Sequence, residues 1–385
     1  MKYRKFGKLD IDVSALGFGT MRFPVKENAS GGTRVNNEVD EKEAIRMIRH
    51  AVDQGVNYID TAYGYHEGNS EIITGRALKD GYRGKVMLAT KSPVWLINKP
   101  EDFDKLLDEQ LKKLGTDHID FYLLHAIGRD RWRNTIIKHD VLRQMERAKK
   151  DGKIGHVGFS FHDDADAFTE IIDGYDKWDF CQIQYNYLDI ENQAGVKGLK
   201  YAASKGLGIV IMEPLLGGKL ANPPKDVKAI LEGSGRDLSP SNWALEWLWN
   251  QPEVSVVLSG MSSMQQVEEN LVSAEHSGIG VQSASDLEII ERVRRRYEER
   301  AVIPCTACSY CMPCPNNVDI PRNFALYNDS VIHDDLEGSQ RNYNNFMDED
   351  SRANSCIQCK VCEEKCPQKI LISEWMPKVH EALKK

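Results

Sequence analysis

Four side chains that can exchange or stabilise protons follow short apolar runs in the N-terminal part of the chain. Asp60 and Tyr65 stand at and just after the end of one run, and Lys91 and His125 each follow a later run. If these runs are strands of one parallel barrel, their carboxyl ends meet at a single face, where such folds build their active sites. The four residues therefore predict one proton-transfer site assembled from three strand ends.

These four side chains could form a general acid, in which neighbouring groups lower the pKa of a phenol. A free phenol has a pKa of about 10 and donates its proton reluctantly near neutral pH, but a neighbouring ammonium group lowers that value. A buried Lys91 would itself tend to lose its proton, and the carboxylate of Asp60 keeps it charged. His125 and Tyr65 can then stabilise the oxyanion that develops on a substrate carbonyl.

Eight apolar, strand-like runs alternate with amphipathic helical stretches, and this alternation must position the four side chains. The runs lie at residues 14–19, 56–60, 86–90, 119–125, 155–160, 180–185, 208–212 and 254–260. Eight alternations within about 300 residues predict a closed (β/α)8 TIM barrel, with an open doubly wound sheet as the alternative. We also expect a hairpin before the barrel and two long segments, 24–37 and 216–239, that cover its mouth.

The composition is that of a globular protein without a membrane span. The chain has 385 residues, of which 41% are hydrophobic and 28% charged, with a formal net charge of -8. This length accommodates one large domain and a smaller one. The negative net charge argues against nucleic acid as the main partner. Because no apolar run approaches the roughly 20 residues of a membrane helix and the start lacks the apolar region of a signal peptide, we expect a cytoplasmic protein.

Eight of the nine cysteines form two short runs near the C-terminus. Such spacing in a cytosolic enzyme indicates metal ligation and not disulfides. The second run has the bacterial ferredoxin pattern, and the first is one residue shorter before its last cysteine. In that pattern three cysteines of a run bind one 4Fe-4S cluster, and the fourth, before proline, binds the other. The crossed sets would be Cys305, Cys308 and Cys311 with Cys366, and Cys356, Cys359 and Cys362 with Cys314.

Two alternatives stay open for these cysteines: a pair of structural zinc sites, since zinc also binds thiolates, and a single cluster with the other cysteines idle. The segment between the runs is longer than in compact ferredoxins and resembles the helical ferredoxin modules of multi-subunit oxidoreductases. We therefore expect a barrel over residues 1–300 and a mostly helical, ferredoxin-like iron–sulfur domain over 301–385. Cys181, alone on a barrel strand, is expected to be a buried apolar residue.

The segment from Asp60 to Leu78 resembles the signature of the aldo/keto reductases. It reads Asp-Thr-Ala-x-x-Tyr, followed by Gly-Asn-Ser-Glu and Gly-Arg-Ala-Leu, and the resemblance covers roughly the first 285 residues. It implies that reduced NAD or NADP delivers hydride to a carbonyl. It also makes Tyr65 the general acid, Lys91 its partner held by Asp60, and His125 the group that orients the carbonyl oxygen.

The same resemblance assigns cofactor contacts to later strands and loops. These contacts are Ser160, Gln184, Pro214, Leu215, Gly217, Gly260, Glu269 and Asn270. After the serine at this position many members of the family have asparagine, whereas this chain has Phe161. Residues 260–267 contain no Lys or Arg, although a 2′-phosphate recruits cationic side chains. The choice between NAD and NADP therefore stays open.

The combination predicts an oxidoreductase that reduces a small carbonyl, or oxidises the alcohol, and is linked to electron transfer through the clusters. A hydride carries two electrons whereas each cluster passes one, so coupling needs an electron-splitting centre. A flavin at the barrel mouth or on a redox partner protein is the candidate for that centre. The alternative function is an electron-transfer subunit whose barrel is a binding scaffold for a partner redox enzyme.

Overall fold

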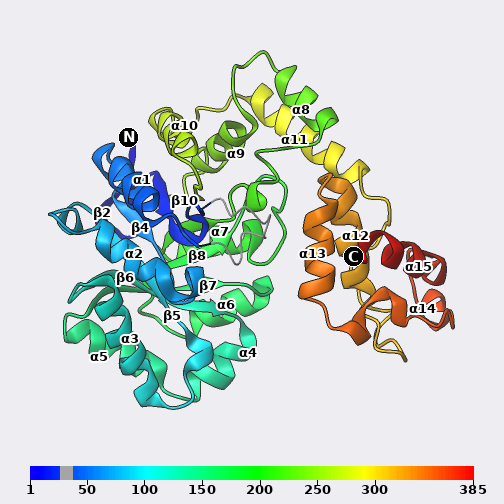
Figure 1. Cartoon of the computed structure of the whole chain (residues 1–385), viewed down its shortest axis with the longest axis horizontal. Coiled ribbons are helices and arrows are strands. Elements are labelled where there is room, and N and C mark those ends of the chain that lie inside the picture. The colour runs from blue at the N-terminus through cyan, green and yellow to red at the C-terminus, as the bar shows by residue number, and fades with distance from the viewer. Residues whose placement is uncertain (27–37) are drawn as a thin grey trace. The chain divides into compact units, whose positions relative to one another are not determined.

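The computed structural model describes residues 1–26 and 38–385, and a closed barrel of eight parallel strands dominates it (Figure 1). In barrel order the strands are β10, β3, β4, β5, β6, β7, β8 and β9. Their bounds are Leu16–Gly19 (β3), Tyr58–Asp60 (β4), Met87–Ser92 (β5), Ile119–Ile127 (β6), Ile154–Phe161 (β7), Phe180–Gln184 (β8), Gly208–Met212 (β9) and Val256–Gly260 (β10). The predicted (β/α)8 barrel is confirmed, and the open sheet is excluded.

A hairpin precedes the barrel, as expected, and fills the end where the strands begin. Its strands β1 (Tyr3–Phe6) and β2 (Leu9–Ser14) pair in antiparallel fashion. The ring of Phe6 packs inside the barrel, with its centroid 4.7 Å from that of Phe121 and 5.6 Å from that of Phe180. Because these buried rings fill this end, the opposite end of the barrel is the one left for chemistry.

Helices surround the barrel and bury their apolar faces against the outer surface of the strands (Figure 1). Their starts and ends follow local signals: the carboxylate of Asp40 caps the first helix by accepting from the N–H of Glu43, and Gly115 ends α3 in a left-handed conformation. The bounds are Glu41–Asp53 (α1), Asn69–Ala77 (α2), Pro100–Leu114 (α3), Arg129–Arg131 (α4), Val141–Lys150 (α5), Ala165–Asp173 (α6), Gly195–Ser204 (α7), Pro240–Trp249 (α9) and Met264–Glu275 (α10).

The described chain divides into two compact units, of which the second is mostly helical. This second unit comprises Asn222–Pro240 and Ala284–Lys385. Its helices are Lys225–Glu232 (α8), Ala284–Glu299 (α11), Ile320–Ile332 (α12), Leu336–Asn345 (α13), Val361–Glu364 (α14) and Ile372–Leu383 (α15). Phe324, Tyr343 and Met376 are fully buried in a core of its own. The predicted helical character of the C-terminal region is confirmed.

The boundary between these units does not fall at residue 300. Helices α8 and α11 both belong to the second unit, because Asp226 accepts hydrogen bonds from Arg296 Nε at 2.7 Å and from Arg300 Nη1 at 2.9 Å. The segment 216–239, expected to cover the barrel mouth, therefore contributes α8 to the second unit. Most of the other expected cover, 24–37, lies outside the described residues. The division into domains 1–300 and 301–385 stays a prediction about which parts fold independently.

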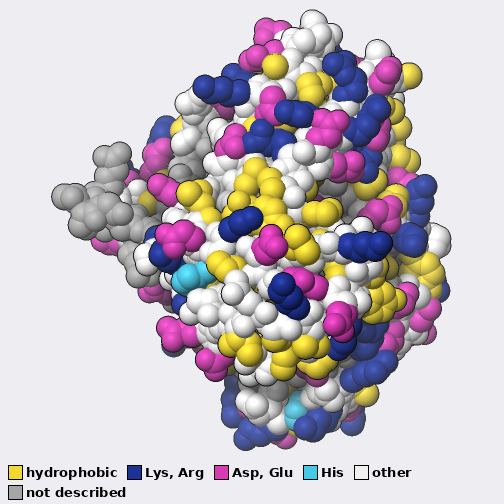
Figure 2. Space-filling view, turned by 90° about the vertical axis from the view of Figure 1, so that its right-hand side faces the viewer, with side chains coloured by type: hydrophobic (Ala, Val, Ile, Leu, Met, Phe, Trp, Pro, Cys, Tyr) yellow, Lys and Arg dark blue, Asp and Glu magenta, His cyan; other side chains and the backbone are white. Residues whose placement is uncertain are grey.

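The surface carries charges of both signs. Figure 2 shows Lys and Arg side chains interspersed with Asp and Glu side chains over the visible face, in agreement with the modest net charge of -8. Within the part of the chain that the structure describes, no helix combines the length and the apolar character needed to cross a membrane.

Candidate active site and cysteine cavities

A buried ion pair connects the ends of β4 and β5. Lys91 Nζ lies 2.5 Å from Asp60 Oδ1 and donates a second hydrogen bond to the carbonyl of Thr61 at 2.8 Å. The side chains of Lys91 and Asp60 are only 1% and 3% exposed. Burial alone would lower the pKa of Lys91, but the carboxylate of Asp60 and the phenol of Tyr65 raise it above its ordinary value. The ammonium group therefore stays charged inside the barrel.

The phenol of Tyr65 stands beside this ion pair. Tyr65 begins the short helix η2 (Tyr65–Gly68) after β4, and Lys91 Nζ lies 5.1 Å from the centroid of its ring. Burial raises the pKa of Tyr65, and the ammonium of Lys91 opposes that rise. Lys91 thus acts in the direction expected from the sequence, but burial is the stronger effect in the isolated chain.

His125 faces the same phenol from the end of β6. Its ring meets that of Tyr65 edge to face, with centroids 6.1 Å apart and planes at 82°, and its other neighbour is Trp95 at 5.2 Å. Burial, followed by the charge of Lys91, lowers the pKa of His125 to about 3. The imidazole is therefore neutral at pH 7 and can donate a hydrogen bond without adding a positive charge. The structure thus brings the four predicted catalytic side chains together.

A local irregularity in the sheet aims His125 into the mouth. The pairing between β6 and β7 changes register between Leu124 and Ile127, and Ala126 has a φ of 51° in the left-handed region. The N–H of Ala126 donates to the side chain of Ser160 on β7, with Oγ at 2.7 Å, instead of to a backbone carbonyl of that strand. Strained backbone of this kind is common beside active sites. Ser160, predicted as a cofactor contact, therefore also holds the end of the strand that carries His125.

The amide of Gln184 is already occupied within the chain. Its Nε2 donates to Asp189 Oδ2 at 2.9 Å, and its Oε1 accepts from Gln193 Nε2 at 3.1 Å. Gln182 lies two residues earlier on the same face of β8, opposite Ser160 in the register. It is 2% exposed, and its Oε1 has no hydrogen-bond partner among the described residues. Sequence reasoning missed Gln182, although the run Gln-Ile-Gln placed both glutamines on one strand face.

Phe161, the departure from the family pattern, points away from the barrel mouth. It is fully buried, and its ring packs against Phe168 of α6 with centroids 4.9 Å apart. This phenylalanine therefore belongs to the layer between strands and helices. It takes no space from a ligand.

The predicted contacts on α10 are engaged in local hydrogen bonds. Asn270 is 5% exposed and donates from Nδ2 to Ser259 Oγ at 2.9 Å, and Glu269 Oε1 accepts from Gln265 at 2.8 Å. The Asn270 bond fastens the helix to the end of β10, whereas the Glu269 bond lies within α10.

The glycines at the ends of β9 and β10 lie beside an arginine that sequence reasoning overlooked. Gly217 belongs to the turn η6 (Leu216–Gly218) after Pro214 and Leu215, and Gly260 ends β10. Arg22 contacts both: atoms of its side chain lie 3.4 Å from a Cβ position on Gly217 and 3.2 Å from one on Gly260. The sequence signal was an arginine three residues after the glycine that ends β3, and it lies outside residues 260–267, where a cation was expected.

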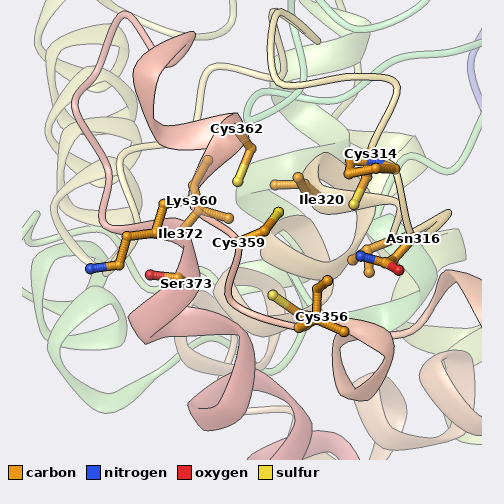
Figure 3. A pocket seen from close by; sticks show the side chains of 12 residues that line it. Cys314, Asn316, Ile320, Cys356, Cys359, Lys360, Cys362, Ile372 and Ser373 are labelled. Carbon is orange, nitrogen blue, oxygen red and sulfur yellow. The ribbon is translucent and has the colours of Figure 1, made fainter.

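One cavity in the second unit is lined by Cys356, Cys359 and Cys362 of the second run together with Cys314 of the first. Figure 3 shows the four sulfur atoms turned toward a common space. Burial raises the pKa of Cys362 to about 11, with Cys356 and Cys314 among its charged neighbours. A thiol in this setting becomes a thiolate readily only beside positive charge, such as that of a metal centre.

A second cavity is lined by the complementary cysteine set, Cys305, Cys308, Cys311 and Cys366. Burial raises the pKa of Cys311, and the other three cysteines contribute to that rise as neighbours. Ile320 and Ile372 line both cavities, so the two spaces share a wall. Among the described residues, no three His, Cys, Asp or Glu side chains converge on a site for a single metal ion.

Comparisons with known proteins agree with both parts of the chain. Residues 15–292 match the aldo/keto reductase family, and residues 304–371 match a 4Fe-4S dicluster domain. The NADH-specific methylglyoxal reductase of Escherichia coli (strain K12) is 28% identical over 318 residues, covering 71% of this chain and 93% of that protein. L-galactose dehydrogenase of Arabidopsis thaliana is 28% identical over 316 residues, with coverages of 75% and 94%.

Among solved structures, the holo form of aldo-keto reductase AKR11C1 from Bacillus halodurans superimposes with a TM-score of 0.61 at 25% identity. It covers 76% of this chain and 96% of its own length. The barrel is thus the part shared with these relatives. The chain is an oxidoreductase that belongs to the aldo/keto reductase family and carries a 4Fe-4S dicluster domain at its C-terminus.

Proposed function

We propose that the barrel reduces small carbonyl compounds, or oxidises the corresponding alcohols, with a nicotinamide cofactor and with Tyr65 as general acid and base. The observation that carries the proposal is the charged Asp60–Lys91 pair, buried against Tyr65 at the barrel mouth. Burying two charges costs more than an apolar pair of similar volume. Such an arrangement suits a site that must stabilise a phenolate during turnover.

The proposed roles follow from the geometry of the four side chains. When bound, the nicotinamide supplies or accepts the hydride. Neutral His125 orients the carbonyl by donating a hydrogen bond to its oxygen, and Tyr65 gives that oxygen its hydroxyl proton. Lys91, held by Asp60 and by the carbonyl of Thr61, stabilises the phenolate that remains. In alcohol oxidation the same phenolate accepts the proton.

Several residues fit a nicotinamide dinucleotide at this mouth. The buried, unpartnered amide oxygen of Gln182 can accept from the nicotinamide carboxamide, and the hydroxyl of Ser160 can donate to it. The other proposed positions on the cofactor path are Gln184, Pro214, Leu215, Gly217, Gly260, Glu269 and Asn270. The absence of Lys and Arg from residues 260–267 and a relative described as NADH-specific make NADH the first cofactor to test.

The second unit fits two 4Fe-4S clusters bound by the crossed cysteine sets. Each cavity collects three cysteines of one run and the last cysteine of the other, as the ferredoxin pattern requires. Structural zinc sites are built from cysteine pairs, whereas each cavity combines three cysteines of one run with the last cysteine of the other. Free thiolate ligands also suit a reducing compartment, and we assign the protein to the cytoplasm.

The link between the two units is the part of the proposal that needs an electron-splitting centre. A flavin, on this chain or on a redox partner protein, would accept a hydride and pass single electrons to the clusters. Anaerobic purification with iron, sulfide and flavin assays, followed by addition of NADH and then NADPH, tests the link. Bleaching of the cluster absorption in a flavin-containing sample would support it. Clusters that stay oxidised in such a sample would show that the two units are not coupled within this chain.

The scaffold alternative has lost one of its two sequence arguments, since Phe161 lies outside the mouth. Its other argument, the absence of Lys and Arg from residues 260–267, bears on the choice between NADH and NADPH and not on whether the barrel is catalytic. Carbonyl-dependent oxidation of NADH by the purified holoprotein separates the two functions. A scaffold would have no such activity.

A further inference from the structure

We propose that Arg131 binds a carboxylate group of the substrate, so that the barrel acts preferentially on oxo acids and on the corresponding hydroxy acids. This inference rests on the proposed function and adds the class of substrate to it. The reaction balances without a further reactant: NADH gives hydride to the carbonyl carbon, Tyr65 passes a proton from solvent to the carbonyl oxygen, and the carboxylate stays unchanged.

Arg131 is the arginine of its segment whose charge has no carboxylate partner among the described residues. The two arginines on either side of it form ion pairs, Arg129 with Asp164 at 2.9 Å and Arg133 with Glu170 at 2.7 Å. Arg131 instead donates from Nη1 to the carbonyl of Ala126 at 2.7 Å, and this bond leaves its other N–H groups open to an acceptor. Because a guanidinium group stays protonated, Arg131 presents an uncompensated positive charge.

Two contacts place this guanidinium beside the predicted catalytic histidine. The carbonyl that it binds, that of Ala126, directly follows His125 in the chain. The Cζ atom of Arg131 also lies 5.7 Å from the centroid of the Trp95 ring, and this centroid is 5.2 Å from that of His125. Burial is the largest cause of the low pKa of His125, and Arg131 is among the charges that add to it. The cation is therefore close enough to act on the group that orients the substrate carbonyl.

Trp95 gives a substrate chain an apolar surface beside both groups. It belongs to the short helix η4 (Val94–Leu96) after β5, and it is 44% exposed. A substrate whose carbonyl oxygen accepts a hydrogen bond from His125 can lay its carbon chain along the indole and reach Arg131 with its other end. One planar guanidinium matches one carboxylate through two parallel hydrogen bonds. A single free arginine at this position therefore fits an oxo acid.

The other charges of the mouth leave the β6 side positive. The carboxylate of Asp60 is offset by Lys91 at 2.5 Å. Burial lowers the pKa of His162, Glu213 opposes this change, and Arg131 adds to it. Glu213 follows β9, so the acid and the free arginine stand at different strand ends. A substrate anion is therefore attracted to the end of β6 and repelled from the end of β9.

Rate measurements on the holoprotein with NADH test the assignment. The substrates are 2-oxopropanoate, 4-oxobutanoate and 5-oxopentanoate, each compared with its methyl ester, which keeps the carbonyl but is neutral. In the wild type we expect kcat/KM to be higher for at least one acid than for its ester. Arg131→Gln keeps a donor for the carbonyl of Ala126 but removes the charge. It should lower kcat/KM for that acid about 10- to 100-fold, mainly through KM, and change the ester little.

Two further variants show whether charge at this position is the cause. Arg131→Lys should recover part of the loss, because it restores the positive charge without the planar fork. Arg133→Gln is the matched control, since Arg133 lies on the same segment but is paired with Glu170. It should leave the rates with acids and esters unchanged.

The salt dependence of the wild type gives a second test if Arg131→Gln does not fold. The ratio of kcat/KM for the acid to that for its ester should fall as ionic strength rises, because salt screens the attraction to the cation. The net charge of -8 would by itself repel the acid and give the opposite trend. A ratio that stays constant or rises would overturn the inference.

Two other results would also overturn it: equal losses for acid and ester in Arg131→Gln, or a wild type that favours every ester over its acid. In both cases activity with the esters would leave the proposed function standing. A wild type that reduces neither the acids, the esters nor methylglyoxal, with NADH or with NADPH, would overturn the proposed function and the inference together.

Discussion

The barrel mouth and the cysteine cavities are assembled in opposite ways. At the mouth, side chains from neighbouring strands already satisfy one another: Lys91 has Asp60 and a carbonyl as partners before any ligand arrives. In the cavities, neighbouring thiols crowd together, and burial raises the pKa of Cys311 and Cys362. The barrel site is therefore preorganised by the fold, whereas we expect the cysteine unit to gain stability when its metal centre binds. Damage to the two regions should have different consequences.

The most complete structural loss, that of a whole cluster, is expected from breaking one cysteine set at its crossing point. Cys366→Ser should remove the cluster bound with Cys305, Cys308 and Cys311, and Cys314→Ser should remove the other, so iron per chain falls by about half in each variant. Carbonyl reduction by the barrel should persist in both. Iron analysis and the visible spectrum measure the loss. If either variant kept its full iron content, the single-cluster alternative or a different ligand set would replace the crossed pair.

Tyr65→Phe is the matching change at the mouth and should leave the clusters intact. Removing the hydroxyl deletes the proton donor, and we expect kcat for carbonyl reduction to fall about 10²- to 10⁴-fold. The dissociation constant of NADH should change little, because the roles proposed for Tyr65 concern the substrate oxygen. Steady-state kinetics and a binding titration separate the two quantities. A variant with nearly full activity would remove Tyr65 from the mechanism.

Lys91→Met tests how strongly the ion pair is preorganised. It leaves the carboxylate of Asp60 buried without a partner, and a broken buried pair costs about 3–5 kcal/mol of unfolding free energy. The double variant Asp60→Asn, Lys91→Met should recover much of that loss, because no lone charge remains. Denaturant unfolding of the three proteins gives the comparison. Equal stability of the single and double variants would mean that Asp60 becomes protonated once Lys91 is removed, so that no lone charge is left in the barrel.

His125 gives the smallest expected effect, a change in the pH dependence of stability. Its pKa is about 3 in the folded chain, against about 6.5 for a free histidine. Between these values the unfolded chain binds more protons, so stability is complete above about pH 6.5 and is lost as pH falls toward 3. In His125→Gln the melting temperature should fall less steeply across this window. His276→Gln, at an exposed position, is the control that should follow the wild type.

The sequence predicted those parts of the fold and of the candidate sites that follow from regularly spaced residues. Alternating runs predicted the eight strands, and the residues at their ends predicted Asp60, Lys91 and His125 as neighbours of Tyr65, because strand ends converge in a barrel. Cysteine spacing similarly predicted the crossed sets that line the two cavities. In both cases a repeated spacing fixes which side chains face one another.

What the sequence did not predict depends on packing between residues far apart in the chain. The ion pair of Arg300 with Asp226 spans 74 positions and draws α8 into the second unit. Arg22 approaches Gly217 and Gly260 only because β3, β9 and β10 are neighbours in the closed barrel. The pKa of Tyr65 also needed the structure, since burial and Lys91 act in opposite directions.

One labelling experiment tests the central claim most directly. The anaerobic holoprotein is given methylglyoxal, chosen because a relative is named for its reduction, with NADH carrying deuterium in both positions at C4 of the nicotinamide. The account predicts a hydroxyl product with one deuterium on the former carbonyl carbon, formed by the wild type and by Cys366→Ser but not by Tyr65→Phe. A product without deuterium, or an equal yield from Tyr65→Phe, would contradict direct hydride transfer at the Tyr65 site.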